Sequence, residues 1–112
     1  MSHYTPGDVV IVPFPHEGET TKVRPVIVIA VKTNGDLTCC PIRSTPRAGA
    51  LCIPISIDDF SEGGLDLFLE SYVQTDTVRT LKSGVVIGKK GWVTREFFDM
   101  LGKRISVNQN IQ

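Results

Sequence analysis

The chain has 112 residues, a hydrophobic fraction of 41% and 12 basic against 12 acidic side chains. This composition is typical of one globular domain over residues 1–112, and no window approaches the roughly 18 unbroken apolar residues of a membrane span. The N-terminus lacks the basic and apolar regions of a signal peptide, and the three cysteines show neither disulfide nor metal-ligand spacing. We therefore expect a cytoplasmic protein that needs no membrane, metal or cofactor.

The charges are unevenly distributed along the chain. Residues 48–76 hold six acids and no Lys or Arg, whereas residues 77–104 hold seven cations and two acids. Residues 20–47 hold five cations and one acid. Two interpretations stay open: a basic face that binds nucleic acid, or charges that interleave after folding.

The first half of the chain predicts three strands. Residues 7–14 form an apolar run that a Pro-Gly turn signal opens, and a polar loop follows at residues 16–22. Residues 23–31 are mostly β-branched, which favours a strand buried on both faces at the centre of a sheet. The Asn34-Gly35 pair is a strong hairpin signal and joins this strand to the next, residues 37–42.

Arg24 lies near the start of the expected central strand, directly before Pro25. Arginine has no neutral form and is rarely buried without a partner, so we expect its side chain to face something negative. That negative group is either a protein carboxylate, in a structural salt bridge, or an anionic ligand.

The second half predicts shorter strands and a single helix. Residues 51–57 alternate in polarity, and Pro54 favours a sheet edge. Residues 58–66 predict an acidic loop, and residues 71–74 and 77–81 predict short strands. Residues 84–93 predict one more strand or a turn pair, and Thr94 predicts the N-cap of a helix. Short strands followed by one helix indicate a mainly β protein, a small antiparallel barrel with one C-terminal helix.

Four segments in chain order resemble the PemK/MazF family of type II toxin–antitoxin toxins, the mRNA interferases. They are the motifs at residues 7–14, 22–29, 41–45 and 71–81. The resemblance implies an SH3-like barrel, a homodimer, and metal-independent, sequence-specific cleavage of single-stranded mRNA that inhibits growth. It also implies a cognate antitoxin that blocks the site, and DNA binding together with that antitoxin.

The resemblance also implies three catalytic residues. Arg24 matches the arginine of the family's Arg-Pro motif, and its planar fork suits phosphate oxygens that gain charge during attack by the ribose 2′-hydroxyl. Thr45 matches a hydroxyl residue that donates to the same phosphate, and Asp76 matches an aspartate that is the base in some members. From the residues alone, Thr45 equally suits a turn before Pro46, and Asp76 a turn carboxylate or a partner of Arg79.

Six further residues are candidates for RNA binding. Phe14 offers a stacking face or a core residue, and His16 offers a base or a solvated loop side chain. Gln74 replaces an arginine found in some members, so it can hydrogen-bond a phosphate or a base but cannot neutralise charge. The complete set is Phe14, His16, Arg43, Ser44, Gln74 and Arg79.

Two rival functions stay open beside the endoribonuclease. One is a toxin on a related barrel that poisons a protein target such as DNA gyrase and cleaves nothing. The other is a non-catalytic RNA-binding regulatory module.

Overall fold

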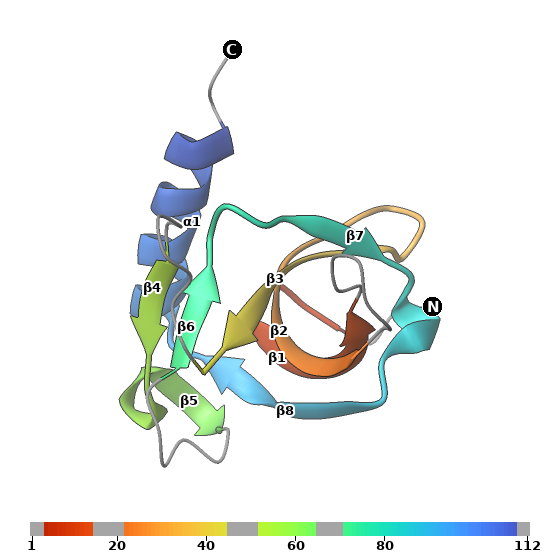
Figure 1. Cartoon of the computed structure of the whole chain (residues 1–112), viewed down its shortest axis with the longest axis horizontal. Coiled ribbons are helices and arrows are strands. Elements are labelled where there is room, and N and C mark those ends of the chain that lie inside the picture. Colours follow the sequence, from red (N-terminus) through yellow and green to blue (C-terminus); the bar gives the residue numbers. More distant parts are fainter. Residues whose placement is uncertain (1–3, 15–21, 45–51, 65–70, 110–112) are drawn as a thin grey trace.

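The structure, a computed structural model, describes residues 4–14, 22–44, 52–64 and 71–109. In these ranges the chain forms one curled antiparallel sheet and a C-terminal helix (Figure 1). The strands are β1 (Asp8–Phe14), β2 (Lys22–Val31), β3 (Leu37–Arg43), β4 (Cys52–Ile55), β5 (Phe60–Gly63), β6 (Ser71–Gln74), β7 (Arg79–Leu81) and β8 (Gly88–Val93). The other elements are the 3-10 turns η1 (Ile57–Asp59) and η2 (Ser83–Val85) and the helix α1 (Arg95–Gln109). The predicted fold class is confirmed.

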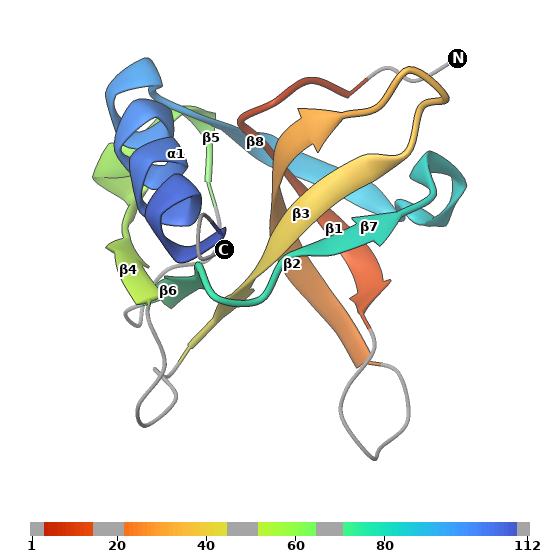
Figure 2. The same cartoon turned by 90° about the horizontal axis from the view of Figure 1, so that it is seen from above.

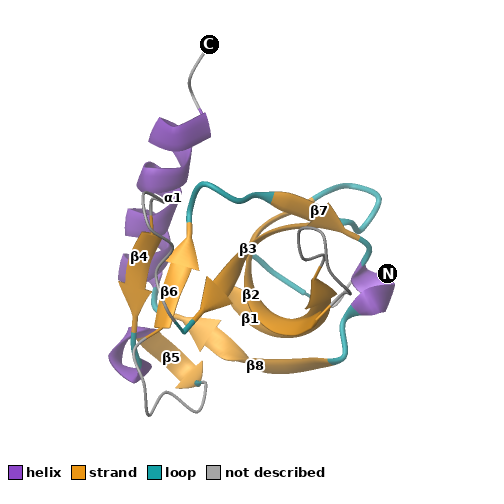
Figure 3. Cartoon of the chain, in the orientation of Figure 1, coloured by secondary structure: helices purple, strands orange, loops and turns teal. Residues whose placement is uncertain are grey.

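The sheet is ordered β4-β6-β3-β2-β1-β8-β5, and β7 adds to β3 outside this path (Figure 3). β2 is therefore central, as its β-branched run predicts. β4 is at one edge, which agrees with Pro54, because proline has no backbone N–H to donate to a neighbouring strand. Strong curling brings β1, β2, β3, β7 and β8 around a common interior, while α1 stands beside β4 and β6 (Figures 1 and 2).

The β2–β3 hairpin follows the Asn-Gly signal. Gly35 has a φ of 93°, which glycine adopts without steric cost, and the Asn34 side-chain oxygen accepts a hydrogen bond from the Asp36 amide at 2.9 Å. The turn aligns β3 with β2, pairing Val31 with Leu37 and Val26 with Pro41.

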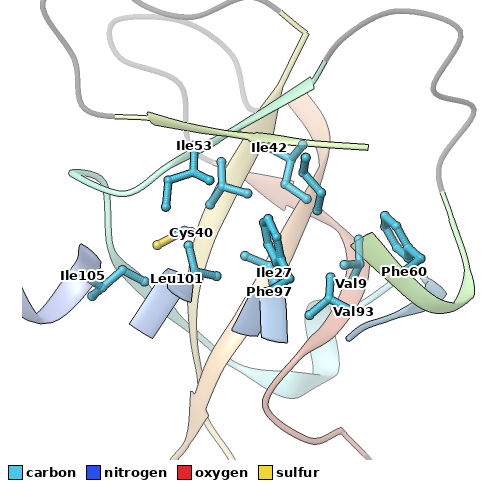
Figure 4. Close-up of a cluster of buried hydrophobic side chains, with 12 residues drawn as sticks. Val9, Ile27, Cys40, Ile42, Ile53, Phe60, Val93, Phe97, Leu101 and Ile105 are labelled. Atoms are coloured by element: carbon cyan, nitrogen blue, oxygen red, sulfur yellow. The ribbon is translucent and has the colours of Figure 1, made fainter. Parts of the chain in front are cut away.

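Two apolar clusters lie on opposite faces of the central strands. Alternation along β2 places Ile27 in one cluster and Val26 and Val28 in the other, which confirms the strand that is buried on both faces. The helix-side core (Figure 4) contains Val9, Ile27, Cys40, Ile42, Ile53, Ile55, Phe60, Val73, Val93, Phe97, Leu101 and Ile105. The barrel-side core contains Val10, Val12, Val26, Val28, Leu37 and Cys39.

Helix α1 begins where the sequence predicts. The Thr94 hydroxyl accepts a hydrogen bond from the Phe97 amide at 3.1 Å, which satisfies one of the free amides of the first turn. Phe97, Leu101 and Ile105 share one face and are buried in the helix-side core. No helix in the described ranges is long and apolar enough to cross a membrane.

The acidic segment after β4 differs from the prediction of a loop. Residues 57–59 form η1 and residues 60–63 form β5, which pairs with β8. Asp59 accepts a hydrogen bond from the Ser56 amide at 2.9 Å, and Phe60 enters the helix-side core. The strand depends on this anchor and on pairing with β8, neither of which a local acidic pattern reveals.

The adjacent thiols of Cys39 and Cys40 provide a prediction about alkaline stability. Burial raises the pKa of Cys39 from 9.0 to about 12. Burial, and then the charges of Cys39 and Asp76, raise the pKa of Cys40 to about 12. Because the folded state holds neutral thiols, their contribution to stability is complete below pH 9 and is lost as the pH rises from 9 towards 12.

We expect the free energy of unfolding to fall through that window by about 1.4 kcal/mol per pH unit for each thiol that ionises on unfolding. Urea unfolding at a series of pH values measures the slope of the unfolding free energy against pH. Cys39→Ala should reduce this slope by about the contribution of one thiol. An unchanged slope in Cys39→Ala would contradict the prediction.

Candidate functional site

The candidate site lies where the central strand pair ends. The end of β1, the start of β2 and the end of β3 lie along one side of the molecule (Figure 2). The β2–β3 ladder stops at Val26 and Pro41, and Arg24 and Arg43 each lie two residues beyond that pair. We call this region, with Arg24, Arg43, Ser44 and Gln74, the arginine end.

Strand alternation places the two arginines on one face. Arg24 has the parity of Val26 and Val28 in β2, and Arg43 has the parity of Leu37 and Cys39 in β3. Both side chains therefore extend the face of the barrel-side core. Two positive charges on one face give it a positive potential, which favours an anion such as a phosphate or a carboxylate.

Arg24 is half-buried and pairs with Val12 of β1. Its Nε is buried and has no hydrogen-bond partner among the residues that the structure describes, and no salt bridge within them involves Arg24. A buried donor without a partner costs free energy, so a structural salt bridge does not account for this arginine in the described ranges. An anionic ligand would supply the missing acceptor.

Gln74 is completely buried at the end of β6, paired with Cys52 of β4. Neither its Nε2 nor its Oε1 has a hydrogen-bond partner in the described part of the chain. Val73 beside it packs into the helix-side core, so alternation directs Gln74 and Tyr72 to the opposite face, which is that of the two arginines.

Asp76 is exposed in the β6–β7 connection, and its Oδ1 accepts a hydrogen bond from the Thr77 hydroxyl at 3.2 Å. Its charge is the smallest of the three causes that raise the pKa of Cys40 in β3. Arg79 is exposed and pairs with Cys39, and its Nη1 donates to the Val78 carbonyl oxygen at 3.3 Å. No Asp76–Arg79 ion pair occurs among the described residues.

Four of the site residues predicted from the sequence are described only in part or lie outside the described residues. Ser44 is exposed directly after β3. Phe14 ends β1 opposite Lys22, but its side chain lies outside the described structure. Thr45 and His16 lie outside the described residues altogether. Within the described ranges, no group of three or more His, Cys, Asp or Glu residues is arranged to hold a metal ion.

A second polar cluster, which the sequence did not predict, lies at the other end of β1. Lys89 Nζ is 3.1 Å from the buried Asp8 carboxylate and 5.1 Å from the centroid of the Trp92 ring. These residues line a shallow cavity of about 280 Å³ with Thr5, Pro6 and Val93. Since Val93 is buried in the helix-side core, alternation turns Trp92 outward.

Residues 5–108 match a family model described as the PemK-like, MazF-like toxin of type II toxin–antitoxin systems. A sequence comparison with curated proteins found no significant match.

Three solved structures are similar to this fold. Toxin MazF-mt6 of Mycobacterium tuberculosis is 18% identical with a TM-score of 0.69, over 94% of this chain and 98% of that one. MazF of Deinococcus radiodurans is 14% identical with a TM-score of 0.72, over 96% and 97%. A mycobacterial endoribonuclease in complex with its cognate antitoxin is 14% identical with a TM-score of 0.68, over 100% and 98%.

At these identities the solved structures establish the fold, and they agree with the predicted SH3-like barrel of this family. The family model establishes the kinship, because it spans most of the 112 residues, including every described residue of the arginine end. This chain belongs to the PemK-like, MazF-like toxins of type II toxin–antitoxin systems.

Proposed function

We propose that this toxin is a metal-independent, sequence-specific endoribonuclease that cleaves single-stranded mRNA in the cytoplasm and so inhibits growth. The observation that carries the proposal is the arginine end. There, Arg24 and Arg43 project from the same end of one strand pair, and the buried Nε of Arg24 has no acceptor in the described part of the chain.

The proposed reaction is attack by a ribose 2′-oxygen on the adjacent phosphorus. The new O2′–P bond forms as the P–O5′ bond breaks, which leaves a 2′,3′-cyclic phosphate and a 5′-hydroxyl. Arg24 stabilises the charge on the non-bridging oxygens through its two-point fork, with a hydroxyl of Thr45 or Ser44 as a further donor. Asp76 accepts the 2′-hydroxyl proton, with His16 as the alternative base, and a proton passes to the O5′ leaving group.

The remaining candidates bind the strand on either side of the reacting phosphate. Arg43 and Arg79 contact the RNA backbone, Phe14 stacks on an unpaired base, and Gln74 hydrogen-bonds the RNA. A homodimer is proposed as the active form.

The test is incubation of the purified protein with long single-stranded RNA in EDTA, followed by mapping of the ends. We expect cleavage at a short recurring sequence, with cyclic phosphate and 5′-hydroxyl termini. RNA that is bound but left intact would support the regulatory module. RNA that is neither bound nor cut, with inhibition of DNA gyrase, would support the protein-poisoning toxin. Cleavage that is restored only by a divalent ion would overturn the metal-independent mechanism.

The second part of the proposal concerns the cognate antitoxin. We expect an acidic antitoxin segment to lie across the arginine end and neutralise the same cations as RNA, so that the two ligands compete. The toxin and antitoxin together would then bind DNA through the antitoxin.

Competition is measured by titrating the co-expressed antitoxin against a fluorescent, uncleavable 2′-O-methyl RNA. Arg43→Glu and Arg79→Glu should weaken both ligands together, and the association of both should slow as salt rises. Arg104→Glu, on the exposed face of α1, is the matched control and should leave both affinities within about twofold. Simultaneous binding of both ligands without loss of RNA affinity would exclude a shared surface.

A further inference from the structure

Gln74 has an unusual environment for a side chain that is to contact a ligand. It is 0% exposed, and both polar atoms of its carboxamide lack a hydrogen-bond partner among the described residues. Burial of an unpaired amide costs free energy, and a methionine of similar length would fill the same space without that cost. Retaining the amide at this position suggests that it meets its partner in another state of the protein.

The backbone holds this side chain towards the candidate site. Gln74 pairs with Cys52 of β4, and Tyr72, two residues earlier on the same face, pairs with Arg43 of β3. The Gln74 side chain therefore lies on the same face of β6 as Tyr72, two residues along the strand from the Tyr72–Arg43 pair. Neither polar atom of Gln74 hydrogen-bonds to Arg24 or Arg43.

The chemistry of a carboxamide selects among possible partners. It offers a donor and an acceptor side by side, and neither has a partner among the described residues. A phosphate offers acceptors only, so it would leave Oε1 unpaired. The hydrogen-bonding edge of an unpaired base presents an adjacent donor and acceptor, and so satisfies both atoms at once.

We propose that Gln74 is a specificity-determining residue of this toxin, which reads one base next to the cleaved phosphate through a two-point contact with its carboxamide. The proposal rests on the proposed function, since it names how the same site chooses its RNA sequence. Because the amide is covered in the free protein, the base reaches it by displacing neighbouring side chains.

The first test is the stability of the RNA-free protein. Gln74→Met removes the unpaired polar atoms at nearly constant volume, so we expect the melting temperature to rise by about 4–8 °C at equal protein concentration. Glu62→Met, at an exposed position of β5, is the matched control and should shift it by no more than about 2 °C. A lower melting temperature in Gln74→Met would show that the amide is bonded within the free protein, and would overturn the proposal.

The second test is base preference, measured both by sequencing of cleavage ends and by anisotropy with a panel of 2′-O-methyl oligonucleotides. In Gln74→Met the preference at one position should fall by roughly 5- to 150-fold, with other positions unchanged. Gln74→Glu keeps the shape but presents two acceptors, so preference at that position should move towards guanine, whose N1–H and N2–H are both donors.

The outcomes separate this proposal from the proposed function. A uniform loss of affinity for every sequence in both variants would make Gln74 a backbone contact and overturn the proposal, as would an unchanged preference. Wild-type protein that binds RNA with base preference but never cleaves it would overturn the endoribonuclease alone, and the oligonucleotide panel would still decide the role of Gln74.

Discussion

Replacement of Arg24 by lysine is expected to reduce the single-turnover rate of RNA cleavage by about a hundredfold or more. Lysine keeps the positive charge but loses the planar fork that contacts two phosphate oxygens at once. The partly buried position adds to the effect, because the rigid strand beside Pro25 holds the guanidinium and cannot move to compensate.

Arg24→Ala should cleave RNA at least as slowly as Arg24→Lys. Circular dichroism is the control, and both variants should give the spectrum of the folded wild type. Arg104→Lys, on the exposed face of α1, makes the same chemical change away from the site and should keep the wild-type rate. Near-normal cleavage by a folded Arg24→Ala protein would remove Arg24 from the mechanism and leave the arginine end without its principal catalytic group.

The second large effect is expected at Gly91, where β8 passes β5. Gly91 has a φ of 133°, and a Cβ there would collide with the Glu62 carbonyl oxygen and lie 2.9 Å from the Gly63 Cα. Both neighbours are backbone atoms of the paired strand, so they cannot rotate away. Gly91→Ala should therefore lower the free energy of unfolding by about 3–5 kcal/mol, the sum of backbone strain and steric overlap.

Chemical denaturation of the purified protein measures this loss, which is a large share of the roughly 5–15 kcal/mol typical of a domain. Gly88→Ala is the control in the same strand, because a Cβ at Gly88 meets nothing within 4 Å. Its stability should stay within about 0.5 kcal/mol of wild type. If Gly91→Ala lost no more free energy of unfolding than Gly88→Ala, the inferred close contact between the backbones of β5 and β8 would be wrong.

Local patterns in the sequence were enough to predict much of the fold. The β-branched run of β2, the Asn34-Gly35 turn and the Thr94 cap each act within a few residues, so their physical causes can be seen without the fold. The resemblance to one toxin family added the type of barrel and the candidate catalytic and RNA-binding residues. The family model over residues 5–108 confirms that resemblance.

Other features depend on contacts between distant segments. The acidic segment at residues 60–63 is a strand because Phe60 is buried and β8 pairs with it, and both conditions come from elsewhere in the chain. Trp92 faces outward because its neighbour Val93 packs into the helix-side core. Propensity is a weak determinant of structure where such contacts supply most of the stabilisation.

The sequence alone thus determined the class of fold, the family and Arg24 as the leading candidate, since each follows from residue types in a local order. Only the tertiary structure placed Arg24 and Arg43 at one end of a shared ladder, with Gln74 on the same face and without a hydrogen-bond partner in the described ranges. These residues belong to three strands separated by loops, and the register between strands decides which side chains meet. That register is set by the cooperative packing of the whole sheet, which no short stretch of sequence contains.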